Sequence, residues 1–310
     1  MMTTIRQHAQ QYLAMRRALG FKLTTFGQRL LSFVSYLEQR GATTITTDAA
    51  VAWAMGTPRS RDQVQWSHRL MVVRVFARHL ATLDPATEIP SGDILPHHYR
   101  RIAPHVYSST EIDALLAATD TMRPRLRAMT WRCLITLLAV TGLRTGEACR
   151  IGRSDIDYDN RVLVVRDSKF GKSRRIPVQD ATIDALRTYD RHRNALCRAA
   201  GASEFFVNIH GRRLDEHNLP RTFAGLVQTA GIQVPAGQRR PRLHDFRHSF
   251  AVATVLDWYR SDADVYAMMP RLATYLGHTD PKHTFWYLTG TPELLALAST
   301  RLDHAFRGQS

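Results

Sequence analysis

Apolar residues recur at three- and four-residue spacing through most of the first eighty positions, which is the period of an amphipathic helix. The segment 5–20 places its apolar residues near one face, and a second periodic run over 26–41 ends at Gly41, a residue typical of a helix terminus. Two further apolar segments follow, at 46–55 and 61–83. The pattern therefore predicts four helices in the N-terminal part.

The helical period is lost between residues 84 and 105, where four prolines and the charged stretch HHYRR occur. Such a composition is typical of a linker. A new helix signal begins at Ser108, because Glu111 stands three residues later, at the spacing of a capping box. We expect a helical domain at 1–84, a linker at 85–106 and a second domain at 107–310.

The second domain contains both the three- to four-residue period of helices and the alternating pattern of strands. An apolar helix is predicted at 126–140, followed by the turn TGLRTGE. The strand-like runs RVLVVRD and RRIPVQD flank the polar segment SKFGKS, which predicts a β-hairpin, and EFFVNI is expected to add a third strand. From Leu186 onward the pattern is mostly helical. The expected fold class is mainly α with a small antiparallel β-sheet (α+β).

Charge narrows the choice of partner. The chain has 310 residues, 44% of them hydrophobic, and a formal net charge of +15. This hydrophobic content is enough for a core in each domain. Both halves carry an excess of basic residues, so a long polyanion that touches both, such as duplex DNA, is the favoured partner.

Several other classes are disfavoured. The most apolar stretch, Cys133 to Val140, is far shorter than the roughly 20 residues that span a bilayer, and the N-terminus has no apolar segment typical of a signal peptide. We therefore expect a cytoplasmic protein without a membrane partner. The three cysteines are far apart, which favours reduced thiols over disulfides or a zinc site. Phosphate-loop, HExxH, GxSxG and GxGxxG motifs are absent, and we expect no metal and no cofactor.

The pattern H-x-x-R can place a histidine and an arginine on one helix face to hold a phosphate. It occurs five times in this arginine-rich chain, so the motif alone has no diagnostic value. Only His244 and Arg247 begin a long apolar helix, where the backbone N–H groups of the first turn also favour an anion. That pair is the candidate phosphate site.

Three segments in this order, TGLRTGEACRI, LHDFRHSFA and YLGHTDPKHTFWY, resemble the three catalytic boxes of the tyrosine recombinases, the phage-integrase and Xer-type enzymes. The basic hairpin lies between the first and second boxes, and Tyr287 follows His278 by nine residues. The resemblance covers the chain from about Tyr107 to its end. The N-terminal helical part resembles the core-binding domain of the family in size and position.

The resemblance implies a set of catalytic roles. Arg144 and Arg247 match the two phosphate-binding arginines, whose bidentate guanidinium groups suit a charged phosphoryl centre. Tyr287 matches the nucleophile that forms a 3′-phosphotyrosyl link, with Tyr275 as the alternative. His244 matches a proton relay and His278 a donor to a phosphoryl oxygen.

Glu147 resembles the acidic residue of the first box, which orients Arg144 and supports the hairpin. An arginine that simply pairs with Glu147 is the structural alternative for Arg144. His248 and His283 are adjacent histidines for which a structural or solvent-facing position is expected.

The hairpin tip contains two of the four lysines among the 42 basic residues, Lys169 and Lys172. Lys169 matches the lysine proposed to protonate the departing 5′ oxygen, and Lys172 is the alternative because Ser168 replaces the first glycine of the family's turn. An ammonium group releases a proton near neutral pH far more readily than a guanidinium does. Both lysines can also serve as plain phosphate contacts.

The resemblance further implies double-stranded DNA with paired inverted-repeat core sites, a tetramer on DNA and a Holliday junction, with accessory recombinases as further partners. The segment 292–306 would dock on a neighbouring protomer. The third box, preceded by a helix with Pro270, is most similar to recombinases of mobile elements, which indicates integration, excision or transposition. The alternatives are a catalytically silent accessory DNA-binding protein and a type IB topoisomerase.

Overall fold

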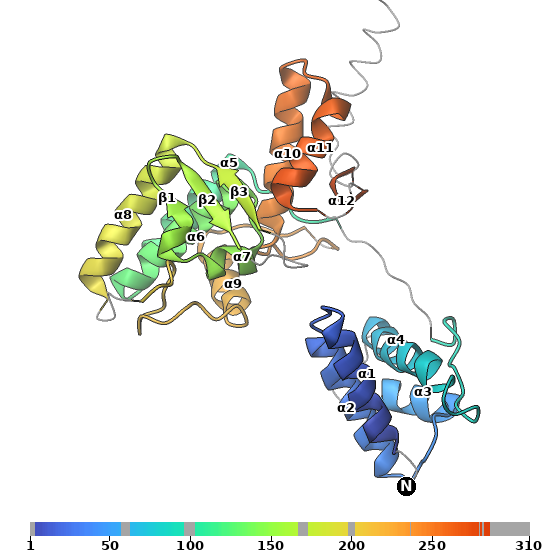
Figure 1. Cartoon of the computed structure of the whole chain (residues 1–310). Helices are drawn as coiled ribbons and strands as arrows, with labels where there is room; N and C mark the ends of the chain where they lie inside the picture. Colours follow the sequence, from blue (N-terminus) through green and yellow to red (C-terminus); the bar gives the residue numbers. More distant parts are fainter. Residues whose placement is uncertain are drawn as a thin grey trace, which may run out of the picture. The chain divides into compact units, whose positions relative to one another are not determined.

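The chain forms two compact units, 1–101 and 102–310 (Figure 1). The computed structural model describes residues 4–56, 63–95, 103–166, 173–197, 202–235, 237–278, 280 and 282–285. Each unit has a buried hydrophobic core of its own. Within the described residues, every helix is too short or too polar to cross a membrane.

The first unit contains the four predicted helices, α1 (Ile5–Ala18), α2 (Thr24–Glu38), α3 (Thr47–Met55) and α4 (Gln63–Leu80). Thr4 and Gln7 form a capping box at the start of α1, which satisfies backbone N–H groups that lack a partner within the helix. All four helices contribute apolar side chains to one core.

Residues 85–95, which the sequence analysis assigned to the linker, pack on this first unit. The Glu88 backbone N–H donates to the Ile45 carbonyl at 2.8 Å, and the Glu88 carboxylate accepts from the Thr47 N–H at 2.6 Å. Leu95 is 7% exposed and belongs to the core of the four helices. The described part of this proline-containing segment is thus an ordered extension of the helical unit.

The second unit is also mainly helical. Its helices are α5 (Ser109–Thr119), α6 (Arg125–Thr141), α7 (Thr145–Arg150), α8 (Asp180–Leu196), α9 (Leu219–Thr229), α10 (Asp245–Arg260), α11 (Val265–Leu276) and α12 (Lys282–Phe285), with a 3₁₀ turn at Arg153–Asp155. Ser108 and Glu111 form the predicted capping box of α5. All three cysteines are buried and unbonded, as expected.

The small sheet has the order β1 (Ile156–Asp157), β2 (Val162–Val165) and β3 (Arg174–Pro177), all antiparallel. Pairing of Val165 with Arg174 confirms the predicted hairpin. The predicted third strand is wrong. The segment 204–209 makes only isolated bridges, Gly152 with Glu204 and Val207 with Arg213, and the third strand is β1. The side chains of the adjacent Phe205 and Phe206 both point into the core and are fully buried.

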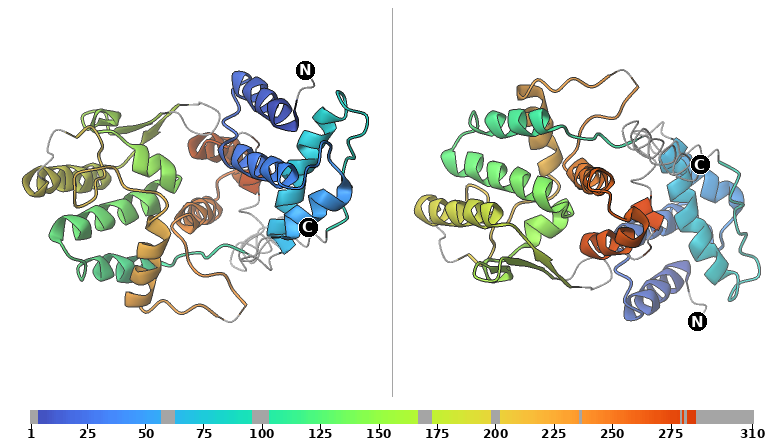
Figure 2. Two further views of the ribbon diagram at one scale, coloured as in Figure 1. Left: turned by 90° about the horizontal axis from the view of Figure 1, so that it is seen from below. Right: turned by 90° about the horizontal axis from the view of Figure 1, so that it is seen from above.

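Helix α6 lies at the centre of the second unit, between α5 and α8 (Figure 2), and also packs on α10. Its apolar side chains form the main core together with the sheet and α9. Helices α10 and α11 pair through a second apolar cluster. The result confirms the predicted class, mainly α with a small antiparallel sheet, and brings the C-terminal ends of α6 and α11 near the first turns of α7 and α10.

Candidate active site

Arg144 occupies the sharp turn between α6 and α7. Gly142 ends α6 in the left-handed conformation, at φ 59°, and Arg144 is the N-cap residue of α7. The Arg144 Nη1 donates to Glu147 Oε1 at 2.7 Å and its Nη2 donates to the Gly277 carbonyl at 3.0 Å. Its side chain is nevertheless 26% exposed. The ion pair with Glu147 therefore fixes this guanidinium without hiding it.

Arg247 lies in the first turns of α10 and is 2% exposed. Its Nη1 donates to the Gly142 carbonyl at 3.0 Å and its Nη2 donates to the Leu276 carbonyl at 2.6 Å. Both carbonyls end a helix, where the aligned peptide dipoles favour a cation. Arg247 thereby ties α10 to the ends of α6 and α11.

Glu147 is the buried carboxylate of the site, with a side chain 1% exposed. Burial by itself would raise the pKa of Glu147, but the hydrogen bonds and charge of Arg174, together with those of Arg144, lower that pKa to about 2. The Arg144 backbone N–H also donates to it at 3.1 Å. Glu147 is therefore ionised at every physiological pH and orients the guanidinium groups around it.

His278 follows Gly277, the left-handed C-cap of α11 at φ 70°. Its backbone N–H donates to the Ala273 carbonyl at 2.9 Å, and its Nδ1 lies 2.6 Å from Oγ1 of the buried Thr284. The Thr284 hydroxyl can donate to Nδ1, which leaves the proton on Nε2. In that arrangement the half-buried ring offers an N–H to an anion.

His244 is the residue before α10 and has an exposed side chain. Desolvation by the surrounding protein lowers its pKa below the ordinary value, and the nearby charges of Arg247 and Arg242 lower it further. The lowered pKa favours the neutral imidazole, which is the form that accepts a proton.

Tyr275, the alternative nucleophile, is partly buried and packs against the hydrophobic core. Its ring stacks on Phe250 with 5.5 Å between the ring centroids, and burial raises the pKa of its hydroxyl to about 12. A partly buried phenol with a raised pKa is a poor nucleophile at neutral pH. The surroundings of Tyr275 therefore favour its structural interpretation.

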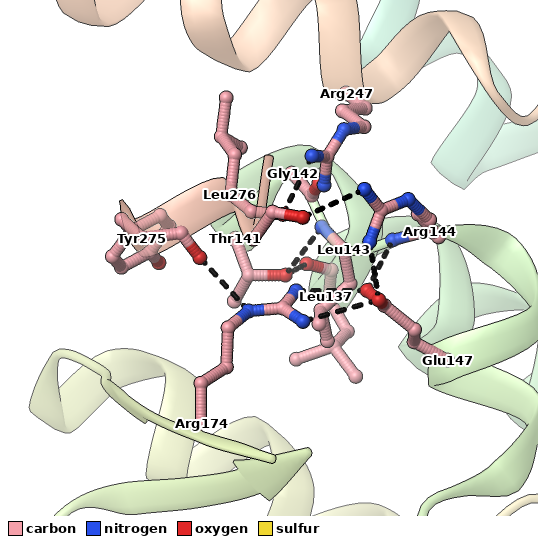
Figure 3. A network of polar contacts seen from close by, with 11 residues as sticks. Leu137, Thr141, Gly142, Leu143, Arg144, Glu147, Arg174, Arg247, Tyr275 and Leu276 are labelled. Atoms are coloured by element: carbon pink, nitrogen blue, oxygen red, sulfur yellow. Dashed lines mark hydrogen bonds and ion pairs between the residues drawn. The ribbon is translucent and has the colours of Figure 1, made fainter. Parts of the chain in front are cut away.

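Arg174 is the residue of this cluster that the sequence analysis missed. Its guanidinium forms two ion-paired hydrogen bonds with Glu147, the carboxylate that also holds Arg144 (Figure 3). A signal was present, since a strand alternates its faces and Arg174 shares a face with Ile176 of the apolar hairpin. An arginine on the buried face of a strand requires an anionic partner.

Three predicted residues, Lys169, Lys172 and Tyr287, lie outside the described residues, and so does the side chain of His283. His248, the other adjacent histidine, is 5% exposed, in agreement with a structural position. Among the residues that the structure describes, no group of histidine, cysteine, aspartate or glutamate side chains could hold a metal ion.

The chemistry of the described cluster is that of an anion site. Arg144 and Arg247 are each bound to carbonyls at helix ends, so both guanidinium groups are held in place before any ligand arrives. Fixed donors of this kind stabilise developing negative charge without the cost of reorganisation. Two guanidinium groups, with the imidazoles of His244 and His278 on adjacent helix ends, suit a phosphodiester.

Comparison with known proteins gives the family of the chain. Residues 106–293 match the phage integrase family. A putative integrase/recombinase of Sinorhizobium fredii, y4rB, is 42% identical over 315 residues, which cover 100% of both chains. The tyrosine recombinase XerD of Lacticaseibacillus casei is 26% identical over 285 residues, which cover 89% of this chain and 90% of the relative.

A solved structure shares the fold. The Tn1549 transposon integrase, in complex with transposon right end DNA, superposes with a TM-score of 0.66 and 16% sequence identity, over 96% of this chain and 98% of that chain.

Proposed function

The chain belongs to the phage integrase family and is a tyrosine recombinase, and we propose that it cuts and rejoins duplex DNA at specific sites through a covalent 3′-phosphotyrosyl intermediate. The observation that carries this proposal is the placement of Arg144 and Arg247. Their guanidinium groups are fixed at the ends of α6 and α11, next to His244 and His278.

In the proposed reaction the Tyr287 oxygen forms a bond to the scissile phosphorus, and the bond from phosphorus to the 5′ oxygen breaks. The tyrosine proton leaves through His244, and Lys169 gives a proton to the 5′ oxygen, with Lys172 as the other candidate. Arg144, Arg247 and His278 donate to the non-bridging oxygens. Attack by a 5′-hydroxyl reverses the step, and no ATP is needed because each broken phosphoester is replaced by another.

The proposed partner is duplex DNA with paired inverted-repeat core sites, on which four protomers exchange strands through a Holliday junction. The segment 292–306 would dock on the neighbouring protomer, and accessory recombinases would be further partners. Support comes from the net charge of +15, spread over both parts of the chain, and from the likeness to a transposon integrase solved with transposon DNA. We infer movement of a mobile element in the cytoplasm as the biological role.

We assign duplex binding to both parts of the chain. Residues 1–84, with the segment 85–95 packed on them, would act as the core-binding domain, the rest of the predicted linker 85–106 as the connection and 107–310 as the catalytic domain. Basic residues in both parts support a clamp that holds DNA from more than one side.

Covalent capture tests the proposal directly. The substrate is a nicked duplex carrying the inverted repeats that flank the gene in its own genome, so that the short cleaved fragment diffuses away and the adduct accumulates. We expect a protein–DNA adduct on denaturing gels for the wild type and none for Tyr287→Phe, because the phenylalanine lacks the attacking oxygen.

Tyr275→Phe is the matched control, since its hydroxyl, with a raised pKa, should be dispensable and its adduct should equal that of the wild type. An adduct that survives Tyr287→Phe, or that disappears in Tyr275→Phe alone, would contradict the assignment of the nucleophile.

A further inference from the structure

Arg174 begins β3, the second strand of the hairpin, yet its side chain is only 13% exposed. Its guanidinium uses three nitrogens toward two partners. The Nε donates to the Tyr275 carbonyl at 2.9 Å, while Nη1 and Nη2 donate to Glu147 Oε1 and Oε2 at 3.1 and 2.8 Å (Figure 3). Only the planar fork of an arginine can satisfy these directions together.

Three successive carbonyls at the end of α11 each accept from a different arginine. Tyr275 accepts from Arg174, Leu276 accepts from Arg247 and Gly277 accepts from Arg144. These are carbonyls that a helix end leaves without partners inside the helix. Arg174 therefore shares its anchoring element with both arginines assigned to the scissile phosphate.

Arg174 also changes how Glu147 and Arg144 share charge. One carboxylate between two guanidinium groups leaves one positive charge in excess, whereas Glu147 with Arg144 alone would be neutral. With Arg174 present, Arg144 keeps its attraction for an anion while Glu147 fixes its direction. Without Arg174, Arg144 would have to neutralise a carboxylate whose side chain is 1% exposed.

The turn that precedes His278 also packs against the side chain of Arg174. A Cβ atom on Gly277 would lie 2.9 Å from Nη1 of Arg174 and 3.1 Å from its Cζ, so the guanidinium packs directly against the backbone of this turn. The Gly277 residue, at φ 70°, sets the direction of the chain into His278. Removing Arg174 would leave the turn without this support.

From these contacts we propose that Arg174 is a positioning residue of the cleavage reaction. It acts through Glu147 on Arg144, and through the end of α11 on His278, and it does not touch the DNA phosphate itself. The inference rests on the proposed function and adds to it a residue that the three catalytic boxes do not contain.

The first test compares Arg174→Ala and Arg174→Lys with Arg175→Ala. Arg175 is the adjacent arginine of the same strand, and its side chain is exposed on the opposite face. We expect single-turnover adduct formation at saturating protein to fall about 10²-fold in both Arg174 variants, because small misplacements of catalytic groups have effects of that size. DNA affinity of the two Arg174 variants should remain at the wild-type value, and so should the adduct rate of Arg175→Ala at saturating protein.

A modified substrate separates phosphate positioning from proton donation. A 5′-bridging phosphorothiolate has a thiolate leaving group, which needs no proton from the enzyme. We expect this substrate to leave the Arg174→Ala defect unchanged. Rescue by the sulfur substrate would overturn the proposal, because it would assign the defect to the hairpin lysine instead of the phosphate-binding groups.

A double-mutant cycle tests action through Glu147. In the Glu147→Gln background the carboxylate no longer competes for Arg144, so adding Arg174→Lys should lower the rate by a smaller factor than it does in the wild type. Equal factors in both backgrounds would contradict the inference. Thermal melting of each variant checks folding, and Arg174→Lys, which keeps the charge, carries the cycle if Arg174→Ala fails to fold.

The outcomes separate the two proposals. A wild-type protein that forms no adduct on its cognate site would refute the proposed function. A wild-type protein that forms the adduct, with Arg174→Ala as fast as Arg175→Ala, would refute only the role of Arg174.

Discussion

At the scale of one residue, His248 shows how burial determines the protonation of a side chain near the candidate active site. It follows His244 by one turn of α10 and is 5% exposed. Desolvation lowers its pKa to about 4, against the opposing charge of Asp245 and with a further small lowering from His244. The ring is therefore neutral in the folded protein at pH 7, while an unfolded chain would protonate it with a pKa near 6.5.

This difference predicts a pH-dependent stability. Below about pH 6.5 the unfolded state binds more protons than the folded state, so the free energy of unfolding should decrease as the pH falls toward 4, by roughly 3 kcal/mol in total from this group. Urea unfolding between pH 4.5 and 7.5 measures it. His248→Gln should flatten the dependence, and the exposed control His217→Gln should not. Equal slopes in the two variants would contradict the prediction.

The residues of the site were only partly accessible from the sequence. The three boxes single out Arg144, His244, Arg247 and His278 because each stands in a recognisable local pattern. Arg174 carries only the weaker signal of an arginine on the apolar face of a strand, and its partners Glu147 and Tyr275 are 27 and 101 residues away, so the sequence does not identify them. Its role becomes visible only in the folded chain, where β3 meets the end of α11 and helix α7.

At the scale of elements, the turn from α6 to α7 positions the arginines of the candidate active site. Gly142 ends α6 at φ 59°, and its carbonyl accepts from Arg247 at 3.0 Å. A Cβ atom here would lie 2.6 Å from the ring of Phe250 and 3.2 Å from Leu276. Both the backbone conformation and the space therefore require glycine.

Gly142→Ala should lower the free energy of unfolding by about 2 kcal/mol or more, from the left-handed conformation and the clash together. It should also slow adduct formation, because the carbonyl that fixes Arg247 must move. Gly225→Ala, inside α9 with open space around the new methyl group, is the control and should be neutral or stabilising by up to about 1 kcal/mol. Urea unfolding and single-turnover assays measure both. A Gly142→Ala protein as stable and as fast as Gly225→Ala would refute the argument.

Periodicity predicted the helices and the hairpin of this fold well, since long amphipathic runs and alternating strands bury one face each. It failed for the third strand. EFFVNI has strand composition, but Phe205 and Phe206 are both 0% exposed, and two adjacent residues buried together do not alternate as a half-exposed strand requires. The two residues of β1 are too short to leave a periodic signal.

At the scale of the whole molecule, the net charge of +15 serves the binding of a polyanionic partner and says little about the fold. The arginines of the candidate site account for a small part of it, and they are held by Glu147 and by helix-end carbonyls. Many others are exposed on the surface, such as Arg239 and Arg240 in the segment before α10. We assign Arg239 and Arg240 to DNA backbone phosphates, which set affinity without reading sequence.

Affinity for DNA should therefore depend steeply on salt. Each phosphate neutralised by an arginine releases counterions, so a protein with roughly six to ten phosphate contacts loses about 10³–10⁵-fold in affinity between 50 and 200 mM salt. Fluorescence anisotropy with a labelled duplex measures the slope of log K against log salt.

Replacing Arg239 and Arg240 by alanine should make that slope shallower by about 2, for any duplex sequence. Arg132→Ala is the control, because its Nη1 already pairs with Asp120 at 3.3 Å. A slope that stays unchanged in the double variant would remove the segment before α10 from the DNA interface, and a slope near zero in the wild type would contradict backbone binding as the source of affinity.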